Sequence, residues 1–210
     1  MDVSYLDRTA CAERRSRLAR CLGNHGALVA AGAPRPRGTH RGLLPFRAAS
    51  HFLYLFGLHL PKAMGLWTGE RWQLYLPEPA PEAALWTGPE PSLSELGETL
   101  GLPVLPLTAL PEALVGKAFA TLAAPDVETC LEQSSLLGRE IRPGKLPGAD
   151  ELLADSLIAM RLVHDASAIV GLRQAAAATA AAAGGASSES SSQPELTAAP
   201  RPGRCRGRAP

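Results

Sequence analysis

The sequence predicts an α/β fold in which helices cover a β-sheet. Hydrophobic residues make up 46% of the 210 residues, enough to form a packed core. Segments with a helical spacing of apolar residues alternate along the chain with short apolar segments typical of strands, and proline or glycine separates them. Helices that alternate with strands pack in layers on a sheet, so a sandwich is expected.

The first predicted helix covers Tyr5–Leu22. Its apolar residues fall near one face, and Gly23 and Asn24 end it. The opposite face is expected to carry the arginines Arg14, Arg15, Arg17 and Arg20. The short apolar segment Ala27–Ala31 predicts a buried strand, and Gly32–Leu44, rich in proline and glycine, predicts a loop.

The most aromatic part of the chain is Phe46–Gly57. Here Phe52, Tyr54 and Phe56 alternate with leucines, so both faces of an extended segment would be apolar. This pattern predicts a central strand covered on both sides.

A β-hairpin is predicted next, from strands over Ala63–Thr68 and Arg71–Leu76. Gly69 and Glu70 between them have the composition of a two-residue turn.

Three short elements follow the hairpin. The first is a helix over Ser92–Leu100, in which Ser92 and Glu95 have the spacing of a capping box. The others are a strand over Val104–Leu107 and a helix over Leu110–Phe119.

Residues Asp150–Ala183 predict helix, with an interruption near Asp165–Ser167. Ser167 can cap the second part, Ala168–Ala183, which ends in a run of alanines. Its large apolar residues need a partner surface: Ile169, Val170 and Leu172.

The last segment, residues 184–210, consists mainly of Ser, Gly, Pro, Arg and Ala. Leu196 is its only large aliphatic residue, so the segment cannot offset the entropy of ordering, and we expect it to be disordered. The basic stretch Arg201–Arg208 also allows a nucleic-acid-binding tail, but it lacks interleaved aromatic residues, and a disordered end is favoured.

Charge and hydropathy exclude several classes of protein. A net charge of +1 argues against a dedicated nucleic-acid binder. No apolar run is long enough to span a membrane, and no secretory signal is visible, so we expect a cytoplasmic protein. The four scattered cysteines predict free thiols, with Cys21 buried.

Common catalytic motifs are absent from the sequence, including dinucleotide-binding glycines, a P-loop, HExxH and GxSxG. His51 and His59 have no further metal-ligand types nearby and are predicted to be packing or surface histidines. Asp150, Glu151 and Asp155 are predicted to form a solvated helix start, because carboxylates favour the first turn.

Four segments resemble, in order, the N-terminal part of the aminopeptidase P family. The longest, Pro45–Gly57 (PFRAASHFLYLFG), resembles the signature PFRQ-SDF-YLTG. The others are Tyr5 with Arg14-Arg15, similar to Y..RR..L; Leu85–Pro89, similar to the WTGP turn; and Leu157–Asp165 with Gly171–Ala176, similar to the LR.IKD..EI..LR.A segment that leads into the catalytic domain. The sequence departs from the family at His51, Phe56 and His164, where Asp, Thr and Lys are usual.

The resemblance implies a three-layer α/β sandwich with a mixed sheet of about six strands. It also implies a metallopeptidase that releases an N-terminal residue preceding proline, so its substrates are peptides with proline at the second position. In the family, two manganese ions bound by two Asp, one His and two Glu activate a water. These ligands belong to a C-terminal pita-bread domain. A homo-oligomer is also compatible with the family.

None of the five ligands can be placed on this sequence. No His follows His164, and Glu189 and Glu195 are the only carboxylates after Asp165. We therefore assign no catalytic or metal residue and expect this chain to bind no cofactor by itself. The change of composition after Ala183 resembles a shifted reading frame or a truncated gene.

Three regions follow from the resemblance: an N-terminal domain over 1–150, a linker and first catalytic-domain helix over 151–183, and a tail over 184–210. Two other interpretations stay open. Another chain could supply the catalytic half, or the protein could be a free-standing binding, regulatory or oligomerisation module of the same fold.

Two residues are candidates for contact with substrate. Trp86, in the segment similar to the WTGP turn, resembles a tryptophan that contacts substrate in some relatives, and its indole could stack on a prolyl ring. A core position is the alternative for Trp86. Arg47 either bonds backbone carbonyls at the start of the predicted strand, which we favour, or faces the catalytic cleft.

Overall fold

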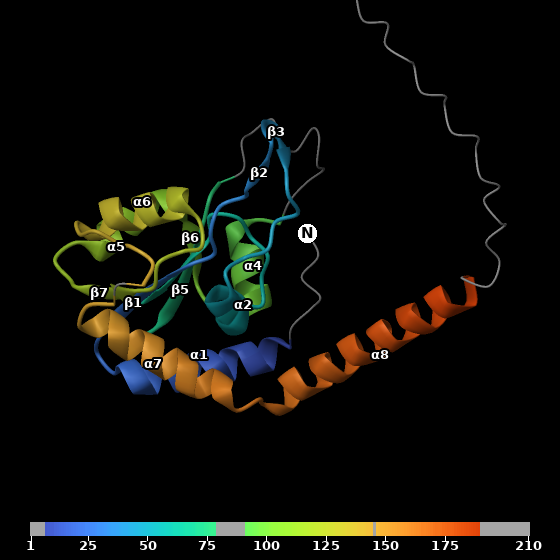
Figure 1. The fold of residues 1–210 in the computed structure, drawn as a ribbon. Coiled ribbons are helices and arrows are strands. Elements are labelled where there is room, and N and C mark those ends of the chain that lie inside the picture. Colours follow the sequence, from blue (N-terminus) through green and yellow to red (C-terminus); the bar gives the residue numbers. More distant parts are fainter. Residues whose placement is uncertain (1–6, 79–90, 145, 190–210) are drawn as a thin grey trace, which may run out of the picture. The chain divides into compact units, whose positions relative to one another are not determined.

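A computed structural model describes residues 7–78, 91–144 and 146–189. The chain divides into two compact units, Met1–Ser167 and Ala168–Pro210. The first unit is an α/β sandwich, shown in Figure 1. The described part of the second unit is helical and belongs to α8, which begins at Ala166.

The central sheet of the first unit has five strands in the order β6-β5-β4-β1-β7. Neighbours in the middle are antiparallel, whereas β1–β7 and β5–β6 are parallel, so the sheet is mixed as expected. The strands are β1 (Gly26–Ala30), β4 (Met64–Trp67), β5 (Trp72–Leu76), β6 (Val104–Pro106) and β7 (Phe119–Thr121).

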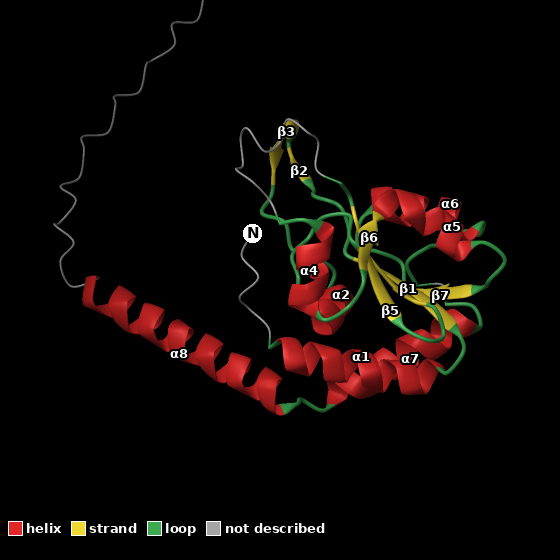
Figure 2. Cartoon of the chain, turned by 180° about the vertical axis from the view of Figure 1, so that it is seen from behind, coloured by secondary structure: helices red, strands yellow, loops and turns green. Residues whose placement is uncertain are grey.

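Helices cover both faces of this sheet (Figure 2). The first face packs against α1 (Arg8–Leu22), α2 (Ser50–Phe56), α4 (Leu93–Leu100) and α7 (Ala149–Leu162). The second packs against α5 (Leu110–Leu114) and α6 (Val127–Leu137). Strand β1 serves both cores, because Ala27 and Val29 point to the first and Leu28 and Ala30 to the second.

The local signals for the hairpin and for α4 are confirmed. Strands β4 and β5 pair out to Trp67 and Trp72, and the amide of Thr68 donates to the carbonyl of Arg71 across the predicted turn. The Ser92 hydroxyl accepts from the amide of Glu95, and the Glu95 carboxylate accepts from the amide of Ser92, which completes the capping box.

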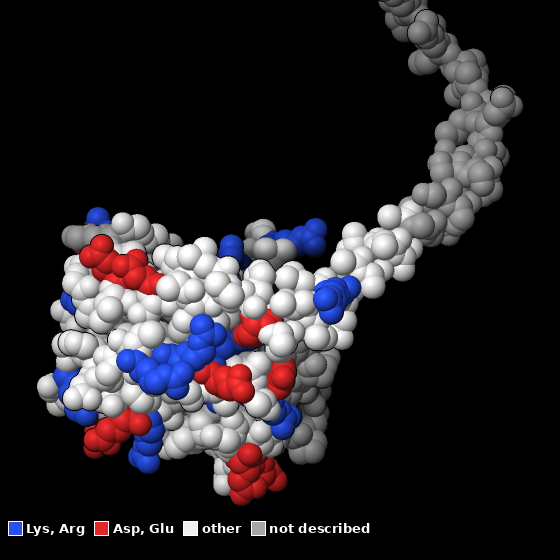
Figure 3. Space-filling model, turned by 90° about the horizontal axis from the view of Figure 1, so that it is seen from below, with Lys and Arg blue, Asp and Glu red and all other residues white. Residues whose placement is uncertain are grey.

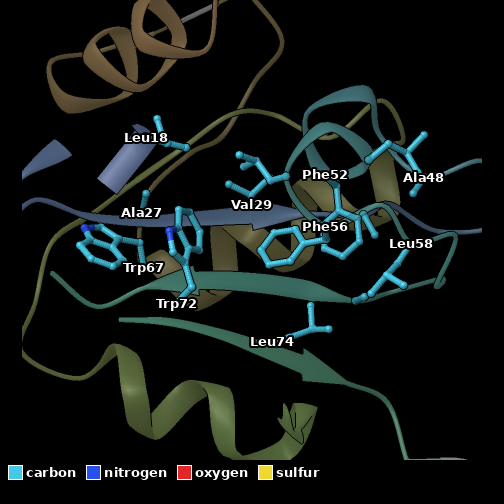
Figure 4. Packing of buried hydrophobic residues seen from close by; sticks show 14 of the residues in the cluster. Leu18, Ala27, Val29, Ala48, Phe52, Phe56, Leu58, Trp67, Trp72 and Leu74 are labelled. Carbon is cyan, nitrogen blue, oxygen red and sulfur yellow. The ribbon is translucent and has the colours of Figure 1, made fainter. Parts of the chain in front are cut away.

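The central strand predicted over Phe46–Gly57 is wrong, because this segment forms helix α2. A run of consecutive apolar residues does not distinguish a buried strand from a buried helix. In the helix, Phe52 and Phe56 lie one turn apart and stack, with ring centroids 4.7 Å apart, as Figure 4 shows. Gly57 ends the helix in the left-handed conformation, with φ 69°.

Other elements differ from the prediction in extent. The helix predicted over Leu110–Phe119 ends at Leu114, and Phe119 starts strand β7. Helix α6 was not predicted, although Asp126 caps its start and Gly138 its end. Two short strands, β2 (Pro36–Arg37) and β3 (Thr39–Leu43), occupy the predicted loop Gly32–Leu44.

The predicted break between the two C-terminal helices is confirmed, but its position differs. Helix α7 ends at Leu162, and α8 covers Ala166–Glu189. Ser167 therefore lies in the first turn of α8 rather than at its cap. The helix also continues past Ala183, and residues 190–210, including Arg201–Arg208, lie outside the described residues.

Cysteine positions correct one further prediction. The thiols of Cys11, Cys21 and Cys130 are free, as expected, but Cys21 is exposed, whereas Cys11 and Cys130 are buried. Burial raises the pKa of both buried thiols. None of the described helices combines the length and apolar character that a membrane crossing requires.

Gly65 on β4 makes a direct test of this packing. A Cβ built there would lie 2.2 Å from Cζ of Phe56, so only glycine lets the ring lie directly on the strand. We expect Gly65→Ala to lower the free energy of unfolding by about 1–3 kcal/mol, because overpacking displaces the aromatic core. Gly171→Ala is the control, since nothing lies within 4 Å of a Cβ at that helical position. Equal stability of the two variants in urea titrations would contradict the described packing.

Candidate functional site

A group of interacting charged and aromatic side chains lies where the chain leaves α7. We call it the elbow cluster and define it as Arg14, His51, Tyr54, Arg161 and Asp165. These residues come from α1, α2, α7 and the break between α7 and α8. The cluster thus joins segments that are far apart in the sequence.

Arg14 holds the break to the body of the first unit. Arg14 is 2% exposed. Its guanidinium donates twice to the Asp165 carboxylate, at 2.7 Å from Nε and 2.8 Å from Nη2. The remaining terminal nitrogen lies 3.3 Å from the carbonyl of Tyr54. These bonds to Asp165 raise the pKa of Arg14, against the opposing effect of burial.

Tyr54 is the aromatic centre of the cluster. The guanidinium carbon of Arg14 lies 4.5 Å from the ring centroid, and that of Arg161 lies 5.8 Å from it. The Tyr54 hydroxyl donates to the carbonyl of Met160 at 3.2 Å. Since carbonyls in the last turn of a helix lack partners within the helix, this bond helps to cap α7.

His51 lies beside Arg161, with 3.4 Å between Nδ1 and Nη1. Burial is the main cause that lowers the pKa of His51, and the positive charge of Arg161 adds to it. Both effects favour the neutral form of the imidazole. Its half-buried position fits the predicted packing role, and His59 is exposed.

Arg15 makes a second, buried connection from α1 to α2. It donates to the carbonyl of Leu55 at 2.8 Å and lies over the ring of Phe56 at 5.5 Å. Its backbone carbonyl accepts from the indole of Trp72 at 3.1 Å. Burial lowers the pKa of Arg15.

The prediction that Arg14 and Arg15 lie on the solvent face of the first helix is therefore wrong. Both point into the protein, because the buried face of α1 runs through Cys11, Arg14, Leu18 and Leu22. The spacing of the two arginines between buried apolar residues was the available signal. The pattern of apolar residues alone does not reveal that the two arginines are buried, since a buried arginine needs particular partners from other elements.

Of the two predicted substrate contacts, the structure describes Arg47 only. Arg47 is exposed just before α2 and donates to the hydroxyl of Ser50 at 3.2 Å. Trp86 lies outside the described residues. A substrate role for either residue stays a prediction.

Asp150 corrects the prediction of a solvated helix start. Its side chain is 3% exposed and forms an ion pair with Arg139 at 2.6 Å. Glu151 and Asp155 on the same helix are exposed, as expected. Helical periodicity places Asp150 on the face that also carries Leu153 and Leu157, both of which are fully buried.

Chemically, the described part of the chain offers a structural junction rather than a metal centre. Within residues 7–78, 91–144 and 146–189, no three His, Cys, Asp or Glu side chains group in a way that could hold a metal ion. The dinuclear site implied by the resemblance does not fit these residues. On the face shown in Figure 3, basic and acidic side chains are interspersed.

Comparison with known proteins gives one consistent result. Residues 11–121 match the family described as "Aminopeptidase P, N-terminal domain", which is more than half of the chain. No curated protein matches the sequence.

Solved aminopeptidase structures share the fold. Aminopeptidase PepP of Pseudomonas aeruginosa is 20% identical, with a TM-score of 0.55 over 63% of this chain and 32% of that chain. Proline aminopeptidase P II of Yersinia pestis is 19% identical, with a TM-score of 0.61 over 80% and 42%. A variant of Escherichia coli aminopeptidase P is 20% identical, with a TM-score of 0.53 over 64% and 33%. This chain thus spans between 32% and 42% of the length of these three structures.

Substitutions at Tyr54 separate two contributions to the elbow cluster. Tyr54→Phe removes the bond to Met160 but keeps the ring for Arg14, so we expect a loss of about 1 kcal/mol in the free energy of unfolding. Tyr54→Leu also removes the ring, and we expect a further loss of about 1–2 kcal/mol. Urea titrations of both variants measure the difference. A leucine variant as stable as the phenylalanine variant would show that the stacked guanidinium contributes nothing.

Proposed function

The chain belongs to the aminopeptidase P N-terminal domain family, and on that premise we propose that it acts as the N-terminal domain of a manganese-dependent Xaa-Pro aminopeptidase. Such an enzyme releases an N-terminal residue that precedes proline. The metals would supply the activated water when bound. The ligands of the metals would come from outside the residues described here. The role of this domain would be to position the substrate and to cover the active site.

The observation that carries the proposal is the elbow cluster. A domain that serves a following catalytic domain must fix the segment that leads to it. Arg14 and Tyr54 hold Asp165 and Met160, and α8 begins immediately after Asp165. The contacts therefore fix the first residues of the connection to the body of the domain.

Trp86 and Arg47 would form the substrate side in this proposal. An indole next to a Gly-Pro sequence offers a flat apolar face to a prolyl ring. Arg47 is exposed, so its guanidinium is available to a peptide carbonyl or carboxylate. Substrates would be peptides with proline at the second position.

A second candidate function is a non-catalytic oligomerisation or binding module. Three large apolar residues on α8 favour it, because Ile169, Val170 and Leu172 are 39%, 52% and 54% exposed. Apolar side chains left in water at this spacing favour association with another helix or domain. In both candidates, nucleic acid is not an expected partner.

The first test is peptide cleavage by the purified chain 1–210. We expect no manganese-dependent release of the first residue from an Xaa-Pro peptide, because the described residues offer no dinuclear ligand set. A full-length aminopeptidase P serves as the positive control. Turnover that a chelator abolishes and added manganese restores would overturn this expectation.

Tryptophan fluorescence tests the substrate side separately. Trp67 and Trp72 are buried, so a response to an added peptide should come from Trp86. We expect an Xaa-Pro peptide to change the emission, the same peptide with glycine in place of proline to have no effect, and Trp86→Phe to abolish the change. A response that is equal for both peptides, or that survives Trp86→Phe, would refute the contact. Sedimentation velocity on the same samples reports association and so measures the second candidate.

A further inference from the structure

The contact between His51 and Arg161 depends on the protonation state of the imidazole. Nη1 of Arg161 lies 3.4 Å from Nδ1 of His51. A guanidinium has donors and no acceptor, so the two groups bond only when Nδ1 carries no proton. A protonated imidazole has an N–H donor on each ring nitrogen and a positive charge. Protonation of His51 therefore replaces an attraction with a repulsion between two cations.

Arg161 attaches the last turn of α7 to the first turn of α2, which carries His51. Its guanidinium carbon also lies 5.8 Å from the centroid of the Tyr54 ring. The first unit ends shortly afterwards, at Ser167. If Arg161 were displaced, the last turn of α7 would depend on the buried Met160 and on the bond that the Tyr54 hydroxyl donates to its carbonyl.

The other charges that face α2 oppose a further positive charge there. Helix α1 turns Arg14 and Arg15 toward α2, and Arg47 lies just before it. Strand β1, which also packs against α2, carries no titratable side chain. The carboxylate of Asp165 already binds Arg14 through both oxygens. A proton on His51 would therefore add to an excess of positive charge.

We propose that His51 and Arg161 form a pH-sensitive latch between α2 and the end of α7, which is closed while His51 is neutral and opens when His51 takes up a proton. This inference does not depend on the proposed function, since a junction that is firm at every pH could serve that function equally well. Burial, and second the charge of Arg161, lower the pKa of His51 from its ordinary value of 6.5. The stabilising contact is therefore fully present above that pH and is lost as the pH falls below it.

Hydrogen exchange of the full chain 1–210 tests the latch. Protection factors, corrected for the intrinsic effect of pH on exchange, are measured for residues 158–165 at about pH 7.5 and about pH 5.5, on either side of the ordinary imidazole pKa. We expect protection to fall about two- to fivefold at the lower pH, the effect of one exposed charged contact. The matched control is His51→Gln, because glutamine offers Arg161 a neutral acceptor that takes up no proton. Since all other titrating groups are shared, the difference between the two proteins isolates His51.

Nuclear magnetic resonance gives a second readout, the titration of the His51 imidazole. We expect Arg161→Met to raise the pKa of His51 and to abolish the fall in protection, because methionine keeps an apolar side chain beside Tyr54 but carries no charge. Equal falls in the unmodified chain and in His51→Gln would overturn the proposal. If a variant does not fold, the unmodified chain decides: constant protection between the two pH values, or a His51 pKa at or above 6.5, would equally overturn it.

Discussion

The bidentate contact between Arg14 and Asp165 is the interaction on which the rest of the junction depends. Arg14 lies on α1, stacks on Tyr54 of α2 and binds the residue that precedes α8. Asp165 is separated from Arg14 by 151 positions in the sequence, so the contact forms only when the sheet and both helices are assembled.

Arginine suits this place because one guanidinium can satisfy several acceptors in a plane while its face stacks on an aromatic ring. Lysine would supply a single point charge and would lose the bidentate geometry. Arg15, the next residue, uses the same properties toward Leu55 and Phe56. The two adjacent arginines thus tie α1 to α2, and Arg14 also ties α1 to Asp165, just after α7.

The parts of this architecture with local signals could be predicted from the sequence. The capping box of α4 and the β4–β5 hairpin depend on residues only a few positions apart. The α/β class followed from the alternation of elements. Helix α2 could not be assigned in this way, because its apolar residues pack against β1, β4 and α1 and local periodicity does not record those contacts. The burial of Arg14, Arg15 and Asp150 was missed for a related reason: charged residues are usually exposed, and only a distant partner reverses that rule.

The measurement that tests the account most directly is a double-mutant cycle on Arg14 and Asp165. The free energies of unfolding of the unmodified chain, Arg14→Met, Asp165→Asn and the double variant isolate the coupling between the two side chains. A buried, bidentate, charge-assisted contact predicts a coupling of about 1.5–3 kcal/mol. A coupling below about 0.5 kcal/mol, the usual limit of additivity for independent sites, would show that the two residues do not act together and would contradict the account.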